Sequence, residues 1–155
     1  MERDFHWHTL EDTQEFGRAL GRLLRGGDLI VLTGDLGAGK TTLTQSIAEG
    51  LGVRGPITSP TFVISRVHPS LVGGPALVHV DAYRLGSAVE LDDLDLDADL
   101  DASVVIVEWG AGLAEQLSDT RLELTISGDL ERTVHAVAVG RRFERVLVDL
   151  PPSVA

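Results

Sequence analysis

The chain has 155 residues, a formal net charge of −11 and no cysteine. Its length is that of one domain, residues 1–155, whose last few residues we expect to be disordered, and the lack of cysteine excludes disulfides, iron–sulfur clusters and cysteine zinc sites. Since no stretch is apolar enough to span a bilayer and an acidic chain repels phosphates, the composition predicts a cytoplasmic protein that neither crosses a membrane nor grips nucleic acid by itself.

The first predicted elements are a helix, a buried strand and a second helix. Thr9 followed by Asp12 is typical of a helix start, and the glycine pair at 26–27 is expected to end that helix. Residues 29–32 form an apolar run, which predicts a buried parallel strand. Apolar residues then recur at helical spacing over residues 43–51 and predict a helix that ends at Gly52.

The rest of the chain predicts further strands, short helices and a terminal hairpin. Apolar or alternating runs predict strands near 63–67, 76–80 and 103–107, a turn at 69–75, short helices within 87–101 and 113–117, an antiparallel hairpin of 122–126 with 134–139 at the sheet edge, and a last strand at 146–148. This order predicts an α/β fold: a single P-loop NTPase-like domain with a mixed, mostly parallel central sheet flanked by helices and an antiparallel C-terminal hairpin.

The loop between the first strand and the second helix carries the most specific motif. Residues 34–41 read Gly-Asp-Leu-Gly-Ala-Gly-Lys-Thr and match the phosphate-binding pattern, in which backbone N–H groups point at phosphate oxygens. Lys40 is the only lysine of the chain, against 12 arginines. In this pattern the lysine reaches the outer phosphates and the following Thr faces Mg²⁺. The motif therefore predicts binding of a nucleoside triphosphate by Asp35, Leu36, Gly37, Ala38, Gly39, Lys40, Thr41 and Thr42.

Two acidic residues stand at the ends of predicted apolar strands. Asp81 follows the run at 77–80, and Glu108 follows the run at 104–107. Nucleotide hydrolysis needs Mg²⁺ and a group to hold it, and a carboxylate at the end of a buried strand suits that role. Both residues are predicted to be catalytic and to belong to the metal site. The pattern leaves open which one binds metal and which one orients water.

Three further features of the sequence indicate a function less specifically. Thr61, within Ser-Pro-Thr-Phe at 59–62, is a candidate catalytic switch residue that senses the γ-phosphate, and Trp109 could stack near the base or pack beside the strand end. The segment from Glu90 to Asp101 is rich in aspartate. It suits either a solvated helix face or a docking surface for a basic partner.

Taken in order, the motifs resemble one family. They are similar to motifs of the bacterial tRNA threonylcarbamoyladenosine biosynthesis ATPases, the TsaE family. In this chain they lie at Gly34–Thr42, Ser59–Phe62, His79–Leu85, Glu90–Leu91 and Val107–Trp109. The resemblance implies a small ATPase that uses ATP and Mg²⁺ and works with the TsaD and TsaB proteins in the modification of tRNA adenosine 37. It implies weak hydrolysis alone and contact with tRNA only through the partners.

The resemblance also implies roles for particular residues. Lys40 would bind phosphates, Thr41 would hold Mg²⁺, and Thr61 would be the switch-loop residue. Asp81 and Glu108 would be the acids of the metal and water site, with Trp109 beside them.

Three other nucleotide-dependent activities are alternatives to this one. A GTPase is disfavoured, because the chain has no asparagine and no second lysine for the guanine motif Asn-Lys-x-Asp. A small-molecule kinase is the main alternative, with Asp81 as the base that activates an acceptor hydroxyl. A nucleotide-binding adaptor without relevant hydrolysis is the third.

Overall fold

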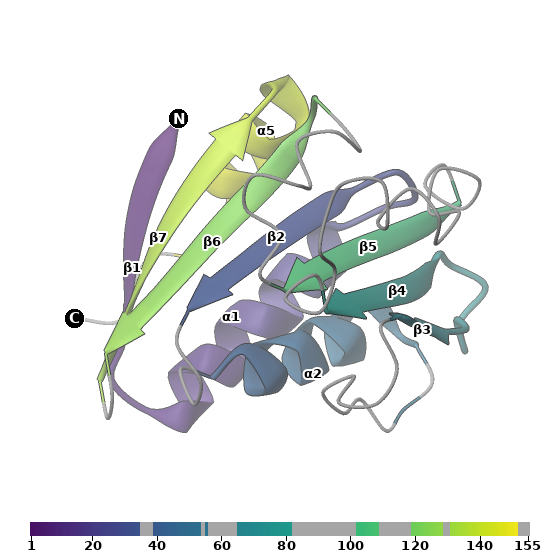
Figure 1. Ribbon diagram of the computed structural model, residues 1–155, viewed down its shortest axis with the longest axis horizontal. Coiled ribbons are helices and arrows are strands. Elements are labelled where there is room, and N and C mark those ends of the chain that lie inside the picture. The colour runs from purple at the N-terminus through teal and green to yellow at the C-terminus, as the bar shows by residue number, and fades with distance from the viewer. Residues whose placement is uncertain are drawn as a thin grey trace.

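The computed structural model describes residues 1–34, 39–53, 55, 65–81, 102–108, 119–128 and 131–151 (Figure 1). Seven strands and three helices are placed in these ranges. In chain order they are β1 (Glu2–Trp7), α1 (Leu10–Leu23), β2 (Leu29–Gly34), α2 (Lys40–Leu51), β3 (Ser65–His68), β4 (Ala76–Asp81), β5 (Ser103–Glu108), β6 (Arg121–Gly128), β7 (Arg132–Val139) and α5 (Arg141–Asp149).

All seven strands belong to one sheet, and this sheet is mixed, as the sequence predicts. The strand order is β1-β7-β6-β2-β5-β4-β3. The central strands are parallel, since β2 pairs in parallel with both β5 and β6, and β4 pairs in parallel with β5. Antiparallel pairs close both ends of the sheet, namely β1 with β7, β6 with β7, and β3 with β4.

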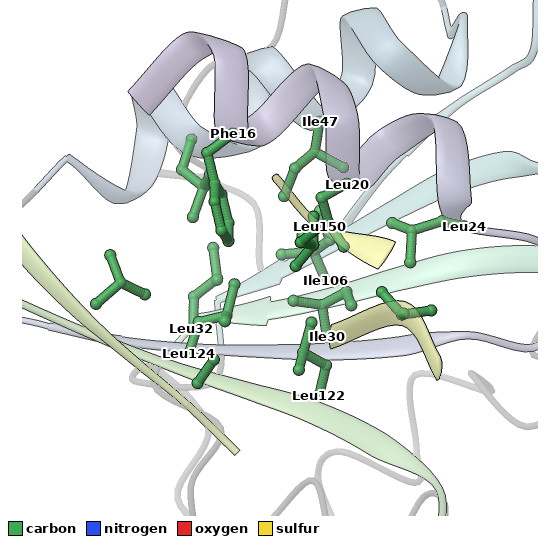
Figure 2. Close-up of a cluster of buried hydrophobic side chains, with 14 of the residues drawn as sticks. Phe16, Leu20, Leu24, Ile30, Leu32, Ile47, Ile106, Leu122, Leu124 and Leu150 are labelled. Carbon is green, nitrogen blue, oxygen red and sulfur yellow. The ribbon is translucent and has the colours of Figure 1, made fainter. Parts of the chain in front are cut away.

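The helices α1, α2 and α5 cover one face of this sheet and lie behind it in Figure 1. Their apolar side chains form a single buried cluster with those of the strands (Figure 2). Phe16 and Leu20 come from α1, Ile47 comes from α2, and Leu150 follows α5. Because all six residues of β5 and the first four of β2 are buried, these strands form the centre of the fold. Among the described helices, none has the length and apolar character needed to cross a membrane.

The predicted starts and ends of the two first helices are largely confirmed. Thr9 caps α1 by accepting the N–H of Asp12, and the Asp12 side chain accepts the N–H of Thr9 in return. The C-cap of α2 is Gly52, in the left-handed conformation. The end of α1 differs from the prediction: the helix stops at Leu23, because Leu24 is extended and Asp28 accepts the N–H of Arg25 to close a turn.

Strand β1 was not predicted from the sequence, and the predicted edge of the sheet is wrong. Strand β1 pairs antiparallel with β7, so the predicted hairpin of β6 and β7 exists but does not form the edge. The available signal was a short alternation, in which Phe5 and Trp7 are buried while Asp4 and His6 are exposed.

The predicted strand at 146–148 is wrong, because these residues lie in the helix α5. Three consecutive apolar residues suit either element, but Phe143, Val146, Leu147 and Leu150 are buried at helical spacing. Arg142 fixes the start of α5, since its Nη2 lies 2.9 Å from Asp28 Oδ2 and 2.5 Å from the Leu23 carbonyl oxygen. The predicted helices within 87–101 and 113–117 lie outside the described residues.

An exposed cluster on β1 and β7 predicts a pH-dependent contribution to stability. His135 Nδ1 lies 2.6 Å from Asp4 Oδ1, and Nε2 lies 3.4 Å from Glu2 Oε1. The hydrogen bond with Asp4, followed by that with Glu2, raises the pKa of His135 above 6.5. This contribution is therefore fully present below pH about 6.5 and is lost as the pH rises through the raised pKa.

We expect Asp4→Asn to weaken this dependence. The measurement is the urea midpoint of the wild type and the variant from pH 5.5 to 8.5, chosen about one to two units on either side of the histidine pKa. A wild-type midpoint that changes with pH no more than that of Asp4→Asn would contradict the expectation.

Candidate nucleotide-binding site

The described residues on either side of the segment between β2 and α2 suit a phosphate-binding loop. Strand β2 ends at Gly34, and Gly39 forms the N-cap of α2 with φ 98°, a left-handed conformation that suits glycine. Among the described residues, no side chain makes a capping hydrogen bond to the start of this helix. The first N–H groups of a helix need partners, and a phosphate group supplies them well. Residues 35–38, and with them four of the predicted phosphate-binding residues, lie outside the described residues.

The side chain of Lys40 connects the start of α2 to the end of β2. Its side chain is only 7% exposed, and Nζ donates a hydrogen bond of 2.5 Å to the Gly34 carbonyl oxygen. Thr41 and Thr42 occupy the first turn of α2 and are partly buried. The ammonium group is therefore held at the start of the loop, beside the helix N-terminus, where an anion would be stabilised by both.

Arg132 also lies at this helix terminus, and no sequence motif had indicated it. A Cβ atom added to Gly39 would contact the Arg132 guanidinium, with Cζ at 2.9 Å, so the guanidinium packs directly against the loop. The register explains this contact. Gly34 pairs with Ile126 on β6, and Arg132 pairs with Gly128 two residues further along β6. Two cationic side chains, Lys40 and Arg132, thus flank the start of α2.

The strand register brings the two candidate acids next to the same loop. Glu108 pairs with Leu32 of β2 on one side and with Asp81 of β4 on the other. Since these three strands are parallel, both acidic residues lie at the edge of the sheet where β2 leads into the loop. Glu108 is 4% exposed and shares the face of β5 that bears Ile106, which is the face covered by the helices. For Asp81 the structure describes the backbone alone.

Glu108 has a buried partner that the sequence analysis did not single out. His79 Nε2 lies 2.5 Å from Glu108 Oε2, and the His79 side chain is fully buried. The available signal was a histidine inside an otherwise apolar strand, because a buried polar group needs a partner. Among the other predicted site residues, Thr61 and Trp109 lie outside the described residues.

The oxygen donors at this edge fit Mg²⁺. Magnesium takes hard oxygen ligands and usually combines one or two carboxylates with substrate phosphates. The Glu108 carboxylate and the Thr41 hydroxyl group are donors of this kind, and the backbone of Asp81 lies next to that of Glu108.

Comparison with known proteins identifies the family of the chain. A family model described as "Threonylcarbamoyl adenosine biosynthesis protein TsaE" matches residues 7–135. A tRNA threonylcarbamoyladenosine biosynthesis protein TsaE of Streptomyces coelicolor is 59% identical over 136 residues, which are 85% of this chain and 92% of that protein. The protein of the same name from Bacillus subtilis is 38% identical over 96% of this chain and 94% of its own length.

A solved structure extends the likeness to three dimensions. The crystal structure of YdiB from Bacillus subtilis superposes with a TM-score of 0.77 and 33% sequence identity, covering 96% of this chain and 93% of that one. The family match spans most of the chain, and the structural match covers nearly all of it. The chain therefore belongs to the TsaE family of threonylcarbamoyl adenosine biosynthesis proteins.

Proposed function

We propose that this chain is a Mg²⁺-dependent ATPase that supports the threonylcarbamoyladenosine modification of tRNA in the cytoplasm. One observation supports the proposed ATPase activity. Lys40 and the start of α2 lie next to the strand ends that bear Glu108 and Asp81. The cationic group that would bind phosphates and the acidic residues that would bind the metal thus lie next to one another. The modification pathway is proposed from the names of the relatives and from family membership.

The residues divide into nucleotide-binding and metal-binding groups. Residues 35–42 would surround the phosphates, with Lys40 on the outer ones, and Trp109 would lie near the nucleotide. Thr41, Glu108 and Asp81 would hold Mg²⁺, which when bound would neutralise charge that develops on the phosphates during transfer. One of the two acids would instead orient the attacking water, and Thr61 would sense the γ-phosphate.

The partners follow from charge and from the family. A chain with a net charge of −11 is poorly suited to hold tRNA directly. We propose that it acts on a complex of TsaD-like and TsaB-like proteins, which would contact the tRNA. Hydrolysis would be weak in the isolated chain, because in related nucleotidases a partner can supply a group that completes the site.

Alanine substitutions of the two acids test the proposed site. We expect Asp81→Ala and Glu108→Ala each to lower ATP hydrolysis about 100-fold, while ATP affinity at saturating Mg²⁺ changes by less than about 5-fold, since these groups act mainly in the transition state once the metal is bound. The control is Glu144→Ala, which removes an exposed carboxylate from α5. Rates would be measured by phosphate release and affinities by calorimetry. Wild-type rates in both acid variants would contradict the assignment.

A further inference from the structure

We infer that His79 is a positioning residue for Glu108: its Nε2–H group donates to the carboxylate and holds it in the orientation used at the metal and water site. This inference rests on the proposed function. It goes beyond it by giving a role to a buried histidine that the proposed chemistry does not otherwise use.

The contact is built by two neighbouring parallel strands. His79 pairs with Ile106 in the register of β4 and β5, and Glu108 lies two residues further along β5 on the same face. Their side chains meet with Nε2 and Oε2 2.5 Å apart. Because both strands are paired on both sides and neither is an edge strand, this geometry is held by the backbone of the sheet.

Within the described part of the chain, the contact between His79 and Glu108 is the polar interaction that the structure shows for these two side chains. His79 is fully buried in a strand whose neighbours Leu77, Val78 and Val80 are buried too. Its second nitrogen, Nδ1, is buried and has no hydrogen-bond partner in the described part of the chain. A histidine placed for packing alone would gain nothing from such a site, since burying a polar group costs free energy. The hydrogen bond to Glu108 accounts for its presence.

The bond also has a consequence for the carboxylate. A buried carboxylate is costly unless it is paired, and a hydrogen bond from a ring N–H provides a partner. His79 engages Oε2, and no described residue is hydrogen-bonded to the other oxygen, Oε1, which we infer serves a metal ion or a water molecule. Removing a group that hydrogen-bonds to a metal ligand without contacting the metal typically lowers metal affinity or activity about 10–100-fold.

Two amide substitutions separate positioning from general packing. In His79→Gln the side-chain amide can reach the position of Nε2 and donate to Glu108. In His79→Asn the amide ends near the position of Nδ1 and falls short. Both variants place an uncharged amide in the same strand, so they are a matched pair that differs mainly in reach.

The experiment titrates Mg²⁺ into each variant mixed with a fluorescent ATP analogue and records affinity. We expect His79→Asn to need about 10–100-fold more Mg²⁺ for half of the metal-dependent gain, and His79→Gln to stay within about 3-fold of the wild type. Affinity for the analogue in EDTA should be equal in all three proteins. A variant that is merely misfolded would lose affinity in EDTA as well.

Unchanged Mg²⁺ dependence in His79→Asn, or equal impairment of both variants, would overturn the inference while leaving the proposed function intact. A wild type that binds no ATP analogue would overturn the proposed function itself.

A second readout needs neither nucleotide nor metal. Nitrogen-15 spectra of the imidazole rings report which ring nitrogen carries the proton, and the His79 signals are identified by their absence in His79→Asn. We expect a proton on Nε2 engaged in a hydrogen bond, and a ring protonated on Nδ1 alone would overturn the inference.

Discussion

Replacing Lys40 with alanine is expected to abolish binding of Mg-ATP while leaving the protein folded. Lys40 Nζ is buried and is held on the Gly34 carbonyl oxygen at the start of the phosphate loop. Removing it takes away the cation nearest to the phosphates, so we expect affinity to fall by at least about 100-fold, equivalent to about 2.8 kcal/mol. Calorimetric titration with ATP and Mg²⁺ measures the loss.

The control for this experiment removes a positive charge elsewhere. Arg141→Ala takes an exposed guanidinium from the first turn of α5, away from the loop, and should bind Mg-ATP as the wild type does. Thermal denaturation of both variants checks that each is folded. Wild-type affinity in Lys40→Ala would mean that the nucleotide does not bind at this loop.

The second large effect is expected on stability, from Gly21→Ala. Helices α1 and α2 pack closely at Gly21, where an added Cβ would lie within 3.0 Å of Ile47 O, Leu51 N and Gly50 C. All three atoms belong to the backbone of α2 and its end, so no side chain can move aside. Alanine would otherwise favour the helix by up to about 1 kcal/mol. The overlap outweighs this gain, and we expect a net loss of about 3 kcal/mol.

This loss should appear as a lower melting temperature. For a chain of this size, 3 kcal/mol corresponds to a fall of about 6–12 °C. Gly74→Ala is the matched control, because a Cβ there would meet only Ser70 Oγ, at an ordinary distance of 3.7 Å. It should change stability by less than about 0.5 kcal/mol. Equal melting temperatures for the wild type and Gly21→Ala would show that α1 and α2 do not approach as described.

The parts of the fold that could be predicted are those whose signal is local. The strands β2 and β5 are buried on both faces, so nearly every residue in them is apolar, and the apolar run by itself predicts a buried strand. The start of α1 could be predicted because Thr9 and Asp12 cap it within a single turn. By contrast, β1 is a six-residue strand with exposed charged residues, and its partner β7 lies at the other end of the chain.

The helix α5 could not be predicted because its local sequence is compatible with two kinds of element. Its run of three apolar residues, Val146 to Val148, suits a strand or a helix, and only packing against the core decides. Phe143 and Leu147 are buried in the same cluster as the sheet residues, while Val148 is exposed. That distribution fits a helix and excludes the alternation of a strand.

The candidate site divides in the same way. Lys40 and Thr41 could be predicted because the phosphate-binding pattern is contiguous, and Glu108 because it ends an apolar run. His79 and Arg132 acquire their positions from strand register, through β5 and β6 respectively, and no spacing in the sequence encodes those pairings.

The measurement that tests the proposed ATPase most directly is ATP hydrolysis by the pure chain, first alone and then with the TsaD and TsaB proteins of the same source. We expect a weak basal rate that rises sharply with the pair and falls in Asp81→Ala. No response to the pair, with turnover appearing only when a metabolite hydroxyl acceptor is supplied, would contradict this proposal and favour a small-molecule kinase with Asp81 as its base.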